Sequence, residues 1–219
     1  MKKLDILYED KELLIVNKPA KLLTIATEKR ESNTLYSMAS FYVKKQYPKN
    51  KVFIVNRLDK DTSGIVVFAK NEKLKHYLQE NWQECALQRL YIGVVEGRVK
   101  GYSTLQYYLA ENSRLNVYVT DKEHGKLCTT KFKTIKSSRA YSLLDIEILS
   151  GRKHQIRVSL SEYGHPLIGD KKYGSHKNPI GRLGLHCYKL TLHVPYRKDD
   201  IVVETKIPKE FLKIFEGGE

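Results

Sequence analysis

Residues 52–70 read V-F-I-V-N-R-L-D-K-D-T-S-G-I-V-V-F-A-K. The apolar runs 52–55 and 64–69 are compact enough to be buried strands. The polar segment 56–63 is therefore predicted to be a loop whose two ends are held by core strands. Loops fixed by a rigid scaffold are where active sites concentrate. A plain structural turn is the alternative at this point, because D-T-S-G is also ordinary turn chemistry.

Outward from this loop, the first half of the chain predicts short strands and two helices. Residues 6–8 and 13–16 are apolar runs around a polar turn, and Pro19 ends the second run. Apolar residues recur at helical spacing after residue 34, with Asn33 or Thr34 as the N-cap. Asn71 is predicted to cap a second helix, one face of which carries Leu74, Leu78, Trp82 and Cys85.

The second half predicts mainly strands. These cover residues 89–95, 115–120, 126–135, 141–149, 190–194 and 201–205, with hairpin-turn chemistry at 121–125, where Gly125 can take a positive φ. A short helix is predicted from about 153 to 163, and Pro208 can open a closing helix. Strands in runs with few helices indicate an α+β fold with a mainly antiparallel sheet flanked by helices. Without repeats or linkers, one domain over residues 1–219 is expected.

The charge balance favours a polyanionic partner. Lys and Arg number 39 against 25 Asp and Glu, which gives a net charge of +14 and a pI near 9.5. Such a surplus is typical of nucleic-acid binding, although a merely soluble alkaline protein has the same composition. No apolar run approaches the ~20 residues of a membrane helix, and no signal-peptide core follows the first lysines. A cytoplasmic protein without membrane association is expected.

The cysteines and histidines do not predict a metal site. Cys85, Cys128 and Cys187 are odd in number and far apart, so neither a zinc ribbon nor a disulfide framework is indicated. His154 and His165 lack suitably spaced Cys or acidic companions. We therefore expect reduced, buried thiols and no metal.

A second basic segment, S-G-R-K-H-Q-I-R, covers residues 150–157. On the predicted helix Lys153 and Arg157 are four residues apart and share a face. Two cations in a first helical turn oppose the macrodipole, so an anionic partner is expected, either a phosphate or a carboxylate such as Asp59. A solvated basic helix start is the ordinary alternative.

Four motifs in order resemble one known family. R-L-D-K-D-T-S-G followed by I-V-V-F-A-K closely resembles the signature loop of the RluA-type RNA pseudouridine synthases. Residues 89–97 resemble the family's second motif, and residues 149–157 with 164–174 its third. L-H-C-Y-K-L at 185–190 resembles the closing motif, and residues 5–19 resemble the entry strands. The resemblance covers residues 5–205, and no room is left for an S4-type N-terminal extension.

The resemblance implies an RNA-modifying isomerase with the pseudouridine synthase catalytic-domain fold. It implies that uridines in rRNA or tRNA are converted to pseudouridine without a cofactor or metal. Asp59 is implied to be the catalytic carboxylate, acting as nucleophile or as base, with Arg157 paired to it and Tyr91 against the uracil. Arg57 is implied to fill the space left by the flipped base. Phosphate or substrate contacts are expected from Arg152, Lys153, His154, Lys171 and Lys172, and from residues 126–139.

The chain departs from the family pattern at a few positions. Asn56 stands where the family usually has His, Ser150 and Lys153 where Thr is common, and Ser159 where His is frequent. The main alternative function is a catalytically inactive RNA-binding protein on the same fold. A DNA-binding regulator lacks a recognition-helix pattern here, and a nucleoside hydrolase would not explain the basic motifs. The sequence does not specify which RNA or uridine is modified, or the oligomeric state.

Overall fold

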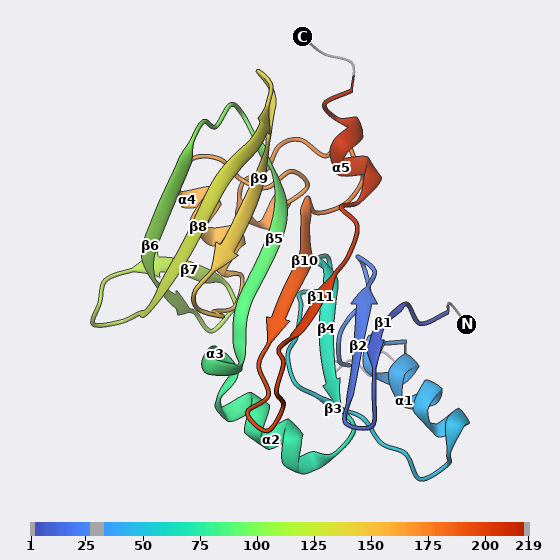
Figure 1. Cartoon of the computed structure of the whole chain (residues 1–219). Helices are drawn as coiled ribbons and strands as arrows, with labels where there is room; N and C mark the ends of the chain where they lie inside the picture. The colour runs from blue at the N-terminus through green and yellow to red at the C-terminus, as the bar shows by residue number, and fades with distance from the viewer. Residues whose placement is uncertain (1–2, 27–32, 217–219) are drawn as a thin grey trace. The chain divides into compact units, whose positions relative to one another are not determined.

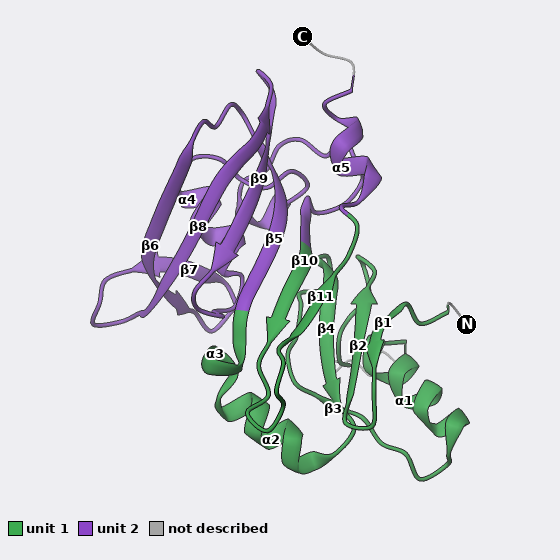
Figure 2. Cartoon of the chain, in the orientation of Figure 1, with its two compact units in different colours: residues 1–87, 187–206 green, residues 88–186, 207–219 purple. Residues whose placement is uncertain are grey.

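The computed structural model describes residues 3–26 and 33–216 (Figure 1). They fold as two compact units: unit 1 comprises residues 1–87 and 187–206, and unit 2 comprises residues 88–186 and 207–219 (Figure 2). Strands β5 (Ala86–Glu96) and β10 (Leu185–Leu192) have residues in both units. Each unit is an α+β arrangement, as predicted. A single domain over residues 1–219 stays a prediction.

The sheet of unit 1 is built around β4 (Ser63–Ala69), in which every residue is buried. Its strands follow the order β1-β2-β4-β10, with β3 on β4 and β11 on β10. The pairs β1–β2, β2–β4, β3–β4 and β10–β11 are antiparallel. The remaining bounds are β1 (Ile6–Glu9), β2 (Leu13–Lys18), β3 (Phe53–Ile54) and β11 (Ile201–Glu204). The predicted strands around the 56–63 loop are confirmed.

The helices of unit 1 begin where the sequence predicts. α1 (Leu35–Gln46) starts with a capping box between Thr34 and Ser37. α2 (Glu72–Glu80) is capped by Asn71, whose side chain accepts from the Leu74 amide at 2.8 Å. The prediction of one continuous face through Trp82 and Cys85 is wrong. The helix stops because Asn81 leaves helical geometry (φ −108°, ψ 26°), and a separate turn, α3 (Trp82–Cys85), follows.

Unit 2 contains a strand that the sequence patterns did not reveal. Its sheet follows the order β5-β9-β8-β6-β7, and all four neighbouring pairs are antiparallel. β6 (Tyr102–Glu111) lies between the other two strands of the predicted hairpin, so β7 (Val117–Thr120) and β8 (Lys126–Ser137) do not pair. The hairpin prediction for residues 121–125 is therefore wrong.

Gly125 is required by close packing and not by a left-handed backbone. It is absent from the positive-φ residues of the described chain, which contradicts the prediction. A Cβ atom there would lie 2.7 Å from the Thr120 side chain and 2.9 Å from Cβ of Tyr108. The turn thus passes tightly over β6, and only a residue without a side chain fits.

The two faces of the unit 2 sheet have different surroundings. α4 (Gln155–Glu162) covers β6, β7 and β8, where Val158 packs with Cys128, Leu109 and Val117. On the opposite face of β8, Lys131 is in register with Glu147 of β9 (Tyr141–Ile148), and Lys133 with Asp145. These lysines therefore face carboxylates across the strands. The unit is completed by η1 (Lys171–Tyr173) and α5 (Lys209–Lys213), which follows Pro208 as predicted.

Hydropathy gives no transmembrane candidate among the helices of residues 3–26 and 33–216, all of which are too short or too polar.

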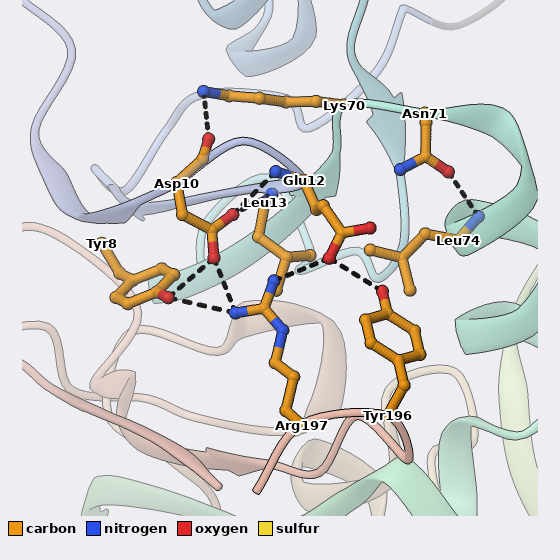
Figure 3. Close-up of polar contacts among 9 residues, drawn as sticks. All are labelled: Tyr8, Asp10, Glu12, Leu13, Lys70, Asn71, Leu74, Tyr196 and Arg197. Carbon is orange, nitrogen blue, oxygen red and sulfur yellow. Dashed lines mark hydrogen bonds and ion pairs between the residues drawn. The ribbon is translucent and has the colours of Figure 1, made fainter. Parts of the chain in front are cut away.

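A polar cluster fixes the turn between β1 and β2 (Figure 3). Asp10 accepts from the Tyr8 hydroxyl at 2.7 Å, from the Leu13 amide at 2.7 Å and from Nη1 of Arg197 at 2.6 Å. Arg197 Nη2 also donates to Glu12 at 3.0 Å. Partial burial of Asp10 opposes ionisation, but these hydrogen bonds outweigh it and lower its pKa to about 2. The cluster joins two segments of unit 1 that are distant in sequence.

We predict that Asp10→Asn lowers the free energy of unfolding by about 2 kcal/mol at pH 7, the equivalent of the pKa shift. Because the folded pKa is depressed, this stabilisation is present above about pH 4 and is lost as the pH falls through 2. Urea titrations of the wild type and of Asp10→Asn at several pH values measure this difference in the free energy of unfolding. Asp199→Asn, a change at an exposed carboxylate, is the control. A difference that stays constant down to pH 2 would contradict the assignment.

Candidate active site

The loop that carries Asp59 alternates between exposed and buried side chains. Arg57 is exposed, Leu58 is buried and Asp59 is half-buried, while Lys60 and Asp61 are exposed. Leu58 therefore attaches the loop to the core of unit 1 directly before the carboxylate. The loop is held at its centre as well as at its ends.

A buried lysine ties this loop to the body of unit 1. Lys18, the last residue of β2, is fully buried. Its Nζ donates to the backbone carbonyls of Pro19 at 3.1 Å, Leu22 at 2.8 Å and Lys60 at 3.0 Å. An ammonium group has three donors, and a charge can be buried only when it is well hydrogen-bonded. Lys18 thus binds the residue directly after Asp59 to the loop that follows β2.

Two further side chains shape the approach to Asp59. Thr24 Oγ1 donates to the Leu58 carbonyl at 2.9 Å and accepts from the Leu58 amide at 3.3 Å. Asn56, which stands where the family usually has His, accepts from the Val67 amide of β4 at 2.8 Å through Oδ1. In this chain Asn56 therefore has a structural role at the start of the loop.

Gly64 allows the end of the loop to pass close to β10. It has φ +120°, and a Cβ atom there would lie 2.1 Å from the Cys187 carbonyl oxygen. Any side chain would push β4 away from β10 within unit 1. This explains the glycine that closes R-L-D-K-D-T-S-G.

In unit 2, Gln155 organises the basic segment. It is buried, and its Oε1 accepts from Ser150 Oγ at 2.8 Å and from the Arg152 amide at 3.1 Å. Its Nε2 donates to the Thr129 carbonyl at 3.0 Å and to Thr130 Oγ1 at 3.1 Å. Gln155 therefore anchors the basic segment to β8, and Ser150 takes part through its hydroxyl group.

The predicted start of the helix is wrong by two residues. α4 begins at Gln155, and its N-cap His154 has a left-handed backbone with φ 52°. Lys153 therefore precedes the helix and does not share a helical face with Arg157. It forms an ion pair with Glu111 of β6, while Arg152 is exposed and lies near the Leu127 carbonyl at 3.4 Å.

Arg157 has a carboxylate partner that the sequence did not predict. Its Nε donates to Asp170 Oδ2 at 2.7 Å and its Nη2 to Oδ1 at 2.8 Å, a bidentate pair. The side chain of Asp170 is 1% exposed and that of Arg157 is 11% exposed. The expected anion near this helix start is thus provided within unit 2, and Asp170 fixes the plane of the guanidinium.

The ring of Tyr173 packs against the guanidinium group of Arg157. The guanidinium carbon lies 5.0 Å from the centre of the Tyr173 ring, within the range of a cation–π contact. The Tyr173 hydroxyl lies 2.6 Å from Nδ1 of His154. His154, predicted as a substrate contact, therefore also holds the ring that packs on Arg157.

Tyr91 lies in the middle of β5, in register with Ile146 of β9. It is 8% exposed. A central strand gives its backbone a fixed position. The aromatic side chain is buried in unit 2, consistent with a rigid ring.

The predicted site residues are divided between the two units. Arg57 and Asp59 share the anchored loop of unit 1, and Tyr91, Arg152, Lys153, His154 and Arg157 belong to unit 2. Pairing of Arg157 with Asp59 stays a prediction. Among the residues that the structure describes, no three His, Cys, Asp or Glu side chains are grouped as metal ligands.

Four positioning residues escaped sequence reasoning: Lys18, Thr24, Asp170 and Tyr173. Lys18 lies in N-K-P, within the entry motif at residues 5–19, and Asp170 and Tyr173 lie in G-D-K-K-Y-G, within the third motif. Thr24 lies outside these motifs. Their roles depend on partners 13 or more residues away, such as Arg157 for Asp170. Ser159, in contrast, lies on the buried face of α4 with its Oγ 3.9 Å from Cys128 Sγ, which gives it a packing role.

Comparison with known sequences identifies the family. The profile described as RNA pseudouridylate synthase matches residues 12–162. This chain belongs to the RNA pseudouridine synthase family. It is 33% identical over 210 residues to an uncharacterized RNA pseudouridine synthase of Bacillus subtilis strain 168, covering 94% of this chain and 70% of that protein. The family's members are isomerases.

A second relative is named for the ribosomal subunit on which it acts. A ribosomal large subunit pseudouridine synthase D of Neisseria meningitidis serogroup A is 32% identical over 221 residues. The match covers 94% of this chain and 59% of that protein, so the relative is considerably longer than the matched part.

Solved structures confirm the fold of the family. Human RNA pseudouridylate synthase domain containing 4 superposes with a TM-score of 0.79 at 20% identity, covering 97% of this chain and 92% of that one. Human RNA pseudouridylate synthase domain containing 1 gives 0.73 at 23% identity, covering 93% and 83%. The predicted pseudouridine synthase fold is therefore confirmed.

We predict that Asp170→Asn lowers kcat for pseudouridine formation by about 10- to 100-fold, with a smaller change in KM. The amide cannot accept both Arg157 hydrogen bonds, and a small displacement of a positioned group costs about this much. Steady-state assays on RNA, run below the melting temperature of the variant, measure it. Glu162→Gln, an exposed carboxylate on the same helix as Arg157, is the control. An unchanged kcat in a folded Asp170→Asn protein would exclude the positioning role.

Proposed function

We propose that this protein isomerises specific uridines of rRNA or tRNA to pseudouridine, with Asp59 as the catalytic carboxylate. The observation that carries the proposal is the three-point anchoring of the Asp59 loop by Lys18, Thr24 and Leu58. This anchoring holds a half-buried carboxylate at a fixed place. A structural turn would not need a buried ammonium group beneath it.

The chemistry needs a carboxylate next to the reacting nucleotide. The bond between N1 of uracil and C1′ of ribose breaks, the base turns, and C5 joins C1′. C5 then loses its proton and N1 carries one, so no atom or electron enters from outside and no cofactor is required. A carboxylate stabilises the positive charge that develops on the sugar, whether as nucleophile or by electrostatics, as in glycoside cleavage.

The other predicted residues have complementary roles in this proposal. Tyr91 stacks on the uracil, and Arg157 pairs with Asp59. Asp170 limits the rotation of Arg157, which presents the guanidinium in one orientation. Arg57, exposed two residues before Asp59, fills the space left by the flipped base.

Phosphate contacts come from the basic segment of unit 2. Arg152 is exposed, and Lys153 would exchange its ion pair with Glu111 for a phosphate. His154 is also proposed as a substrate contact, and its contact with the Tyr173 hydroxyl holds the imidazole ring in place. We also propose that the protein works in the cytoplasm, where rRNA and tRNA are found.

The test is pseudouridine mapping on rRNA and tRNA. The wild type is expected to form pseudouridine at specific sites, detected by selective chemical labelling and primer extension. Asp59→Asn should reduce the rate by at least about 1,000-fold, because it removes the charge that the transition state needs. Asp61→Asn, exposed on the same loop, is the matched control and should remain active.

Two results would contradict the proposal. One is full activity of Asp59→Asn. The other is that the purified wild type forms no pseudouridine in total rRNA and tRNA taken from a strain that lacks this protein. That result would favour an inactive RNA-binding protein.

A further inference from the structure

The segment before the Asp59 loop carries positive charge only. Residues 33–58 contain Lys44, Lys45, Lys49, Lys51 and Arg57 and no Asp or Glu. Asp and Glu make up 25 of the 219 residues, so about three would be expected in a stretch of this length. The segment forms α1 and the connection to β3 in unit 1.

The outward face of α1 combines aromatic rings with these cations. The inward face buries Leu35, Met38, Ala39 and Val43. On the outward face Tyr36 is 39% exposed and Phe41 is 56% exposed. Lys44 and Lys45 are three and four residues after Phe41, so they lie beside its ring. Such pairing of exposed rings with lysines is typical of single-stranded nucleic-acid binding, in which bases stack and phosphates are neutralised.

Helix stability explains part of this charge but not all of it. Lys44 and Lys45 lie in the last turn of α1, where cations suit the macrodipole. Lys49 and Lys51 lie beyond the helix. They line a cavity of about 500 Å³ together with Lys11 and Lys70, residues distant in sequence. Lysines from three segments therefore converge at one place.

Carboxylates neutralise only part of this positive charge. Lys70 is paired with Glu9 at 2.6 Å, and Glu72 is the acidic residue of the cavity lining. Within residues 3–26 and 33–216, no ion pair joins a carboxylate to Lys44, Lys45, Lys49 or Lys51. An external anion would supply the missing charge.

This surface is connected to the Asp59 loop within unit 1. The amides of Leu35 and Tyr36 donate to the carbonyls of Leu23 and Thr24 at 2.8 and 3.0 Å. Thr24 in turn donates to the Leu58 carbonyl, directly before Asp59. The N-terminal end of α1 is therefore tied to the loop, and its twelve residues extend about 18 Å away from that point.

We propose that Tyr36, Phe41, Lys44, Lys45, Lys49 and Lys51, here called the α1 surface, bind the RNA strand that flanks the target uridine. The two rings stack on bases, and the lysines contact successive phosphates. The proposal rests on the proposed function for its substrate. RNA is favoured over a protein partner because the surface is uniformly positive and carries exposed rings.

The test is RNA binding by fluorescence anisotropy at several salt concentrations, with two labelled probes: a single-stranded RNA that contains uridines, and an RNA with a mapped target uridine and its single-stranded flanks. Lys44, Lys45, Lys49 and Lys51 are changed together to Gln. We expect at least tenfold weaker binding at 0.1 M salt and a salt slope smaller by about 3, as expected for four lost phosphate contacts. Phe41→Ala should weaken binding by about tenfold with the slope unchanged, since stacking releases no counterions.

The matched control is Lys209→Gln with Lys213→Gln, two exposed lysines of α5 in unit 2. At saturating RNA the α1-surface variants should keep the wild-type kcat and show a raised KM. Binding and salt slope equal to the control would overturn the proposal, and so would a loss confined to kcat. Anisotropy does not depend on turnover. An inactive wild type would therefore refute the proposed function, but the comparison of RNA binding between the α1-surface variants and the control would still test this proposal.

Discussion

The fold around the candidate site depends on a buried charge. Lys18 brings an ammonium group into the interior of unit 1, where it would be strongly unfavourable without partners. Three backbone carbonyls accept its hydrogen bonds, and one of them belongs to Lys60. Those carbonyls come from two irregular segments, residues 19–22 and the Asp59 loop. One side chain therefore joins both segments and supports the Asp59 loop.

The same arrangement links the catalytic loop to its surroundings. Thr24 bonds the loop at Leu58 and the start of α1 at Tyr36, so the loop and the α1 surface share one support. Unit 2 uses a similar device, in which Asp170 fixes Arg157 through two hydrogen bonds. In unit 1 the buried Lys18 holds the loop that carries Asp59, and in unit 2 the buried Asp170 holds Arg157. Rigid support of this kind keeps reacting groups in position.

Local patterns in the sequence predicted local structure well. The caps at Thr34 and Asn71 and the apolar run of β4 give clear signals, because each depends on neighbouring residues. β6 was missed because only two of its ten residues, Leu105 and Leu109, are buried, and they are four residues apart, without the alternation typical of a strand. Asp170 could not be assigned to Arg157, since that contact forms only after α4 and η1 have packed.

The central claim is that Lys18 holds the Asp59 loop without contacting the substrate. Amide hydrogen exchange of Lys18→Met, compared with wild type and with the exposed-site control Lys21→Met, tests it directly. We predict much faster exchange in the two segments that Lys18 joins, around Leu22 and from Leu58 to Thr62, together with a large loss of kcat while RNA affinity is retained. Unchanged exchange in this loop, with normal kcat in a folded variant, would contradict the account.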